Sequence, residues 1–185
     1  MSNTYTVAVL VGSLRKASIN RKLALALAEL AAPTLKLEIV EIGELPLYNE
    51  DIDVEPVPPA YSAFRAKLKS ADALLFVTPE YNRSMPAPMK NAIDVGSRPY
   101  GQSAFSGKPG AVLSASPGAA GGFGANHHLR QCMVFLDVHM MQQPEAYLGG
   151  AGSFFDDNGK LSDGIKPFLQ KFIDAYAAWV AKNAG

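Results

Sequence analysis

The chain has 185 residues, of which 48% are hydrophobic, and its 17 lysines and arginines balance 17 aspartates and glutamates. This length and composition fit one domain, residues 1–185, with a sizeable core. A net charge of zero argues against nucleic acid or an anionic membrane as the main partner. Cys132 is the single cysteine, so no internal disulfide can form. We find neither a signal peptide nor an apolar run near the roughly 20 residues of a membrane helix, and expect a cytoplasmic protein without membrane insertion.

Segments of strand and helix character alternate along the chain. Apolar runs and alternating patterns predict strands at 5–11, 35–42, 73–78, 111–116 and 139–143. Good helix formers with apolar spacing predict helices at 19–31, 60–70, 89–97, 126–137 and from 162 or 163 to 182. Residues 146–160 are expected to form a loop.

The region before the second helix is rich in proline, and we expect residues 43–59 to be irregular. In the helix at 60–70, helical spacing directs Phe64 and Leu68 toward the core. The same spacing predicts that Arg65 points outward, together with two neighbouring lysines.

This alternation predicts right-handed βαβ crossovers and a parallel sheet with helices on both faces. Five strands favour an α/β three-layer sandwich of the flavodoxin-like order 2-1-3-4-5 over a six-stranded dinucleotide fold. In such a sheet the loops after strands one, three and four meet at the carboxyl edge, where ligands bind. These loops are residues 12–20, 79–84 and 117–122.

The first of these loops has the composition of an anion receptor. Free N–H groups and the dipole at a helix N-terminus favour negative charge, Ser13, Ser18 and Asn20 can add donors, and Arg15 can add a charged fork. An ordinary strand-to-helix turn, with Ser18 or Asn20 as the N-cap, is the lower-ranked alternative. Neither Gly-x-Gly-x-x-Gly nor Gly-x-x-x-x-Gly-Lys-Ser/Thr is present, which favours the monophosphate of a mononucleotide.

The second loop contains Thr-Pro-Glu-Tyr-Asn at 78–82. Tyr81 can pack against a planar ring, and Asn82 can donate to and accept from the ring edge. Taken alone, a proline-rich turn whose tyrosine merely packs explains these residues equally well.

The third loop, which begins after Ser116, is rich in glycine. Glycines allow backbone N–H groups to approach a ligand closely and to stabilise negative charge on a reduced ring. A flexible connector is the alternative, but the position of the loop after a buried strand at the ligand edge favours the ligand.

Several motifs together resemble those of the NAD(P)H-dependent FMN reductase family, in the branch of bacterial quinone and chromate reductases. They are Gly-Ser-Leu-Arg-Lys-Ala-Ser-Ile-Asn at 12–20, Leu-Pro-Leu-Tyr-Asn-Glu-Asp at 45–51, Thr-Pro-Glu-Tyr-Asn at 78–82, Lys-Asn-Ala-Ile-Asp at 90–94 and Gly-Lys-Pro at 107–109. The resemblance covers nearly the whole chain.

The resemblance implies a non-covalently bound FMN and a homodimer or homotetramer. The implied phosphate ligands are Ser13, Arg15, Ser18 and Asn20. The residues implied to line the flavin ring are Pro79, Glu80, Tyr81 and Asn82. Those implied to cover its pyrimidine end are Ser116, Pro117, Gly118, Gly121 and Gly122.

The implied activity is a ping-pong reaction in which NADPH or NADH reduces the flavin and a small-molecule acceptor then takes two electrons. The implied acceptors are quinones, with chromate, azo compounds or free flavin as others. Because the flavin carries the chemistry, we expect no catalytic residue, and we expect no metal site.

Two alternatives to a reductase remain, a flavodoxin-type electron carrier and an FMN-binding redox sensor or interaction module. The carrier ranks lower because the chain has no acidic excess. Tyr48 and Asn49 suit a lid on the nicotinamide side, and a plain surface loop explains them equally well.

Overall fold

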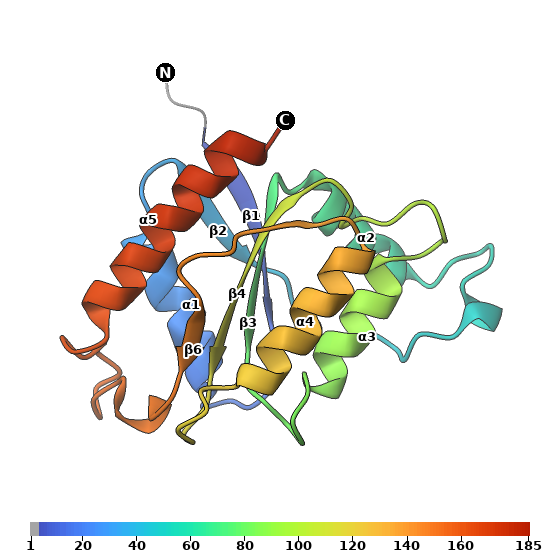
Figure 1. The fold of residues 1–185 in the computed structure, drawn as a ribbon. Coiled ribbons are helices and arrows are strands. Elements are labelled where there is room, and N and C mark those ends of the chain that lie inside the picture. The colour runs from blue at the N-terminus through green and yellow to red at the C-terminus, as the bar shows by residue number, and fades with distance from the viewer. Residues whose placement is uncertain (1–3) are drawn as a thin grey trace.

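A computed structural model describes residues 4–185, in which strands and helices alternate as the sequence predicts (Figure 1). The strands are β1 (Tyr5–Val11), β2 (Leu35–Ile39), β3 (Ala73–Thr78), β4 (Pro109–Ala115), β5 (His139–Met140) and β6 (Ala146–Leu148). The α-helices are α1 (Ile19–Leu30), α2 (Pro59–Ser70), α3 (Ala87–Gly96), α4 (Phe123–Phe135) and α5 (Lys166–Asn183). Short 3₁₀ helices are η1 (Glu50–Ile52) and η2 (Ala151–Ser153).

The sheet is parallel and has the order β2-β1-β3-β4-β5, which confirms the flavodoxin-like topology. The fifth position differs from the prediction, because β5 and β6 both pair with β4 and the chain leaves the ladder between them. The strand predicted at 139–143 is therefore wrong beyond residue 140, and the loop predicted from residue 146 is wrong where β6 forms. The chain reaches β6 through Pro144, which has no N–H to donate to a ladder.

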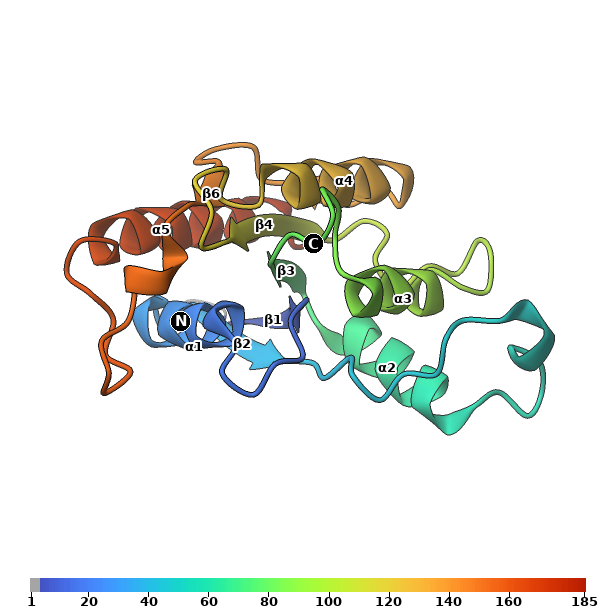
Figure 2. The same cartoon turned by 90° about the horizontal axis from the view of Figure 1, so that it is seen from below.

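Helices cover both faces of the sheet and form the three predicted layers (Figure 2). On one face, α1 and α5 pack Leu23, Leu27 and Phe172 against the strands. On the other, α2, α3 and α4 contribute a second cluster. All of β3 is buried, as expected of a central strand. Within residues 4–185, no helix is both long and apolar enough to cross a membrane.

The outward orientation predicted for Arg65 is wrong. This residue is 8% exposed, and its guanidinium donates to both carboxylate oxygens of Asp53 at 2.8 and 2.6 Å. Its Nε also donates to the Val95 carbonyl at 2.9 Å. A buried charge is tolerated when it is paired and fully hydrogen-bonded. Asp53 lies in the irregular segment before α2, so helical spacing alone could not reveal the pair.

The Gly-Lys-Pro motif at 107–109 has a structural role at the edge of the sheet opposite the predicted ligand edge. The ammonium group of Lys108 donates to the carbonyls of Lys69 and Ala71 at the end of α2. A cation there complements the negative end of the helix dipole. Burial lowers the pKa of Lys108, and the nearby carboxylate of Asp72 partly offsets this effect.

Candidate functional site

The three loops at the carboxyl edge are in direct contact with one another or with adjoining elements. A Cβ on Gly12 would lie 2.7 Å from Thr78 Oγ1 and 3.3 Å from Pro79 Cδ, so the first loop lies against the start of the second. The amide of Asn20 donates to the carbonyl of Ala115 at 3.4 Å, where β4 leads into the third loop. The loops that topology predicts to be neighbours are therefore neighbours in the structure.

The first loop offers a row of unused hydrogen-bond donors. The N–H groups of residues 13–17 donate to none of the described residues. The Ser13 side chain is nearly buried, with 9% of the residue exposed, and its hydroxyl has no partner within residues 4–185. Ser18 is the N-cap of α1 and accepts from the Arg21 N–H at 3.1 Å, as the turn alternative required. Ser18 thus shapes the turn, while the free N–H groups at a helix N-terminus suit an anion.

The three cations near this loop differ in whether they form an ion pair with a carboxylate. Arg21 donates to both carboxylate oxygens of Glu41, at 3.1 and 2.6 Å, and this hydrogen bonding lowers the pKa of Glu41. Arg15 and Lys16 are exposed and form no ion pair with a described residue. A positive charge in reach of an anion is therefore best supplied by Arg15 or Lys16.

Asn20 carries an unsatisfied buried oxygen. The residue is 4% exposed, its Nδ2 donates to Ala115, and its Oδ1 has no hydrogen-bond partner among the described residues. An unpaired buried acceptor costs about 1–3 kcal/mol, so its presence indicates that a donor completes the site. An ionised phosphate oxygen is itself an acceptor, whereas a hydroxyl can donate to Asn20.

The second loop forms a tight hairpin. Tyr81 and Ser84 exchange two backbone hydrogen bonds of 3.0 Å, and the two residues between them have positive φ, 51° at Asn82 and 65° at Arg83. These features define a primed two-residue turn. Tyr81 is 47% exposed at the edge of this hairpin, so its ring is free to pack against a ligand.

The carboxylate of Glu80 is engaged by the protein. It accepts from the N–H of Ala125 at 3.1 Å and from the Arg83 guanidinium at 3.3 Å. The N-cap residue of α4, Gly122, has no side chain to cap the helix, and Glu80 supplies that carboxylate from another loop. Only the backbone of Glu80 therefore remains to line a flat ring.

The third loop is shaped by its serine and glycines. The Ser116 hydroxyl accepts from the Gly118 N–H at 3.2 Å. Gly121 has φ 60°, and a Cβ there would lie 2.6 Å from the Tyr147 carbonyl oxygen. Gly122 has φ 78°, and its Cβ would lie 2.9 Å from the Cβ of Ser114. A side chain at Gly121 or Gly122 would clash with neighbouring parts of the protein, whereas a side chain at Gly118 would have more space.

An aromatic group lies directly behind this loop. Tyr147 donates to Glu145 at 2.9 Å, and its hydroxyl is 3.0 Å from His127 Nε2. The ring of Phe123 lies tilted against that of His127, with ring centres 4.2 Å apart. Burial, followed by the hydrogen bond to Glu145, raises the pKa of Tyr147 to about 12. Tyr147 therefore stays protonated at neutral pH and does not act as a base there.

Sequence reasoning missed the polar side chains that hold the segment between β2 and α2. Asn91 on α3 is 8% exposed and binds three backbone groups of that segment. The signal that could have revealed it is an asparagine next to Ala92 and Ile93 on the apolar side of a helix.

The sheet order and the layers of helices define a flavodoxin-like α/β protein, and the three loops meet at the carboxyl edge of its sheet. The sequence model of the family described as NADPH-dependent FMN reductase matches residues 5–153, and the chain belongs to this family. The resemblance seen in the sequence is confirmed.

Characterised proteins of similar sequence and structure carry related names. The chain is 65% identical over 183 residues to a quinone reductase of Pseudomonas putida, covering 99% of this chain and 98% of that protein. It is 49% identical to a 2-hydroxy-1,4-benzoquinone reductase of Burkholderia sp, covering 94% of this chain and 95% of that one. The solved structure of FerB, a flavoenzyme NAD(P)H:(acceptor) oxidoreductase from Paracoccus denitrificans, superposes with a TM-score of 0.92 at 40% identity, covering 98% and 100% of the two chains.

Proposed function

We propose that the protein is an NAD(P)H-dependent quinone reductase that binds FMN at the carboxyl edge of the sheet. The observation that carries the proposal is the meeting of an anion-receptive loop with the tyrosine hairpin and the glycine loop. Family membership and the names of the similar proteins support the same reaction.

The donors of the first loop fit the phosphate of FMN. The free N–H groups of residues 13–17, the hydroxyl of Ser13 and the charge of Arg15 would hold it. The hydroxyl of Ser18 already caps α1 and can still donate to the same phosphate. The unpaired oxygen of Asn20 fits a hydroxyl of the ribityl chain, because it can only accept.

The other two loops fit the ring. Tyr81, Asn82 and the backbone of Pro79 and Glu80 would line one side, and the N–H groups of residues 119, 120 and 122, which donate to none of the described residues, would face the pyrimidine end. The path of that loop is set by Pro117, which follows Ser116, and by the glycines Gly118, Gly121 and Gly122. When bound, FMN supplies the two-electron chemistry, and the protein orients the rings and excludes water.

NADPH or NADH and the quinone would use the site in turn, so we expect ping-pong kinetics. Chromate, azo compounds and free flavin are further candidate acceptors within the same proposal. We also propose a homodimer or homotetramer in the cytoplasm, supported by the exposed apolar Val134 and Phe135 on α4, which are 77% and 73% exposed. Light scattering of the purified protein tests the oligomeric state, and a monomer would contradict it.

Anaerobic spectroscopy tests the function. We expect purified protein to be yellow, NADPH or NADH to bleach it, and a quinone to restore the colour. Protein that stays yellow with both nicotinamides would instead indicate a carrier or a sensor. Protein that cannot be loaded with FMN would refute the proposal altogether.

Flavin titrations test the assignments within the first loop. Arg15→Ala is expected to weaken binding of FMN more than Lys16→Ala does, and to leave riboflavin binding unchanged because riboflavin has no phosphate. Asn20→Ala is expected to weaken FMN and riboflavin by the same factor, because its oxygen would accept from a hydroxyl that both possess. If Asn20→Ala lowers the affinity for FMN and not that for riboflavin, Asn20 contacts the phosphate instead.

A further inference from the structure

The segment between β2 and α2 is long and irregular but firmly held. We call residues 43–53 of it the strap. Irregular connections longer than about 12–15 residues are uncommon in compact domains and are usually functional or disordered. The strap contains the Leu-Pro-Leu-Tyr-Asn-Glu-Asp motif at 45–51. Its hydrogen bonds argue against disorder.

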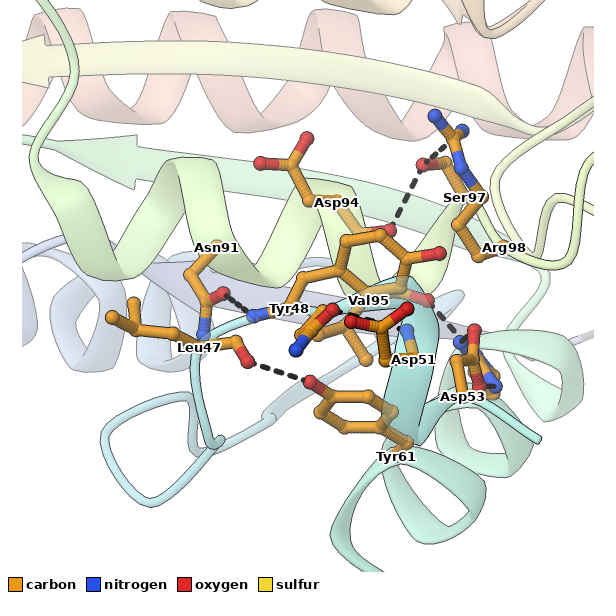
Figure 3. Close-up of polar contacts among 12 residues, drawn as sticks. Leu47, Tyr48, Asp51, Asp53, Tyr61, Asn91, Asp94, Val95, Ser97 and Arg98 are labelled. Atoms are coloured by element: carbon orange, nitrogen blue, oxygen red, sulfur yellow. Dashed lines mark hydrogen bonds and ion pairs between the residues drawn. The ribbon is translucent and has the colours of Figure 1, made fainter. Parts of the chain in front are cut away.

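Two side chains fix the middle of the strap (Figure 3). The amide of Asn91 accepts from the Tyr48 N–H at 2.8 Å and donates to the carbonyls of Leu45 at 3.2 Å and Pro46 at 3.0 Å. The hydroxyl of Tyr61 on α2 donates to the Leu47 carbonyl at 2.8 Å. Four successive residues are thus tied through their backbone, and their side chains take no part in these bonds.

The far end of the strap is fixed by charge and by stacking. Arg65 and Asp53 form the buried pair already described, with 9% and 4% of their side chains exposed. The Tyr48 ring lies 6.1 Å from the Tyr61 ring, and the Arg98 guanidinium lies 5.9 Å from the centre of the Tyr48 ring. The strap is therefore held both in its middle and at its far end.

The strap runs from the first loop to the helix that follows the second. A Cβ on Gly43 would lie 3.2 Å from the side chain of Leu14 in the first loop. Leu45 and Tyr48 pack against the same core cluster as Met85, which belongs to the connection between the second loop and α3. The strap therefore lies against Leu14 of the first loop at one end and against Asn91 of α3, the helix that follows the second loop, in its middle.

Leu47 is the most exposed large apolar side chain of the strap, ahead of Ile52, which is 42% exposed. It is 78% exposed, although its carbonyl is held by Tyr61. In Figure 3 it lies at the end of the cluster beside Asn91, and its side chain points away from Tyr61 and Asp53. An apolar side chain held at a fixed position in water at the edge of a ligand site is suited to contact an apolar ligand.

We propose that the strap is a fixed wall of the electron-acceptor site, that Leu47 contacts the apolar part of a bound quinone, and that Asn91 is a positioning residue that holds Leu47 there. The inference rests on the proposed function and deepens it, because it assigns a preference for quinones with apolar substituents. It involves binding only, and no further chemical step.

The direct test compares two acceptors in Leu47→Ser. Loss of one leucine contact is expected to lower kcat/KM for an alkyl-substituted benzoquinone by about tenfold. The rate with ferricyanide, which has no apolar substituent to bind, should stay near the wild-type value. Leu25→Ser is the matched control, because Leu25 is 51% exposed on α1 away from this edge. Equal losses for both acceptors, or no loss beyond that of the control, would overturn the proposal.

The positioning role is tested with Asn91→Ala, which removes the three hydrogen bonds between Asn91 and the strap and leaves those of Tyr61 and Arg65 in place. We expect KM for the same quinone to rise while FMN affinity and kcat with ferricyanide are retained. Proteolysis should become faster within residues 43–53. Tyr176→Phe is the control for lost stability, since its buried hydroxyl donates to the Leu74 carbonyl at 2.7 Å. Parallel losses with quinone and ferricyanide would reduce Asn91 to a purely structural residue and overturn its assigned role.

Different results would refute the proposed function and the role of the strap. Wild-type protein that binds FMN but passes no electrons from NADPH or NADH to any quinone would refute the proposed function. Active wild-type protein whose quinone preference is unchanged in Leu47→Ser would refute the wall alone.

Discussion

Gly121→Ala provides the strictest test of how the third loop is built. The residue has φ 60°, and the added methyl would lie 2.6 Å from the carbonyl oxygen of Tyr147 and 2.7 Å from the nitrogen of Leu148. Gly150 is a matched position, with φ 64° and nothing within 4 Å of an added methyl. Both substitutions carry the same backbone cost, and they differ only in the space available.

The expected magnitudes follow from these two terms. An alanine in the left-handed region costs roughly 1–2 kcal/mol, partly offset by about 0.4–1 kcal/mol from the stiffer unfolded chain. Gly150→Ala should therefore lower the free energy of unfolding by about 1 kcal/mol. Gly121→Ala must also displace backbone in β6, which adds about 1–3 kcal/mol. Urea denaturation followed by circular dichroism measures both variants, and equal destabilisation by the two would refute the packing argument.

Two further predictions concern charged and titratable groups. Arg65→Met should lower the free energy of unfolding by about 3–5 kcal/mol, because it leaves the Asp53 carboxylate buried and unpaired; urea denaturation should show Arg65→Met with Asp53→Asn to be more stable than Arg65→Met alone. For Tyr147, the folded pKa of about 12 lies above the ordinary value, so its contribution to stability is complete below pH 10 and is lost as the pH rises toward 12. The pKa is measured from the phenolate absorbance of the wild type after subtraction of that of Tyr147→Phe. It should fall in Glu145→Gln, and an unchanged titration midpoint would show that the Glu145 carboxylate does not raise the pKa.

The central strands could be predicted because both of their faces are buried. β1 and β3 have the predicted bounds, 5–11 and 73–78, since an apolar run in the middle of a parallel sheet is as long as the strand it forms. The edge of the sheet was less predictable. β6 has only three residues between a proline and two glycines, too few for a pattern to distinguish it from a loop.

The meeting of the three loops followed from topology, but the side-chain roles within them did not. Glu80 was predicted to line a ring, which stays a prediction, but the bond from the N–H of Ala125 to its carboxylate was not foreseen. Arg65 was interpreted as solvated, and it pairs with Asp53. In both cases the partner is distant in sequence, and a spacing rule describes only neighbours on the same element.

The bond from Glu80 to Ala125 has a consequence for cofactor exchange. It joins the hairpin to α4, so we expect the two walls of the proposed ring site to be ordered when the chain folds and not when the ligand binds. The free energy needed to order a loop on binding usually lowers affinity for the ligand. Here the loops are expected to be ordered before the ligand binds, so this loss of affinity is avoided. We therefore expect the protein stripped of flavin to keep its shape and to take up fresh cofactor without refolding.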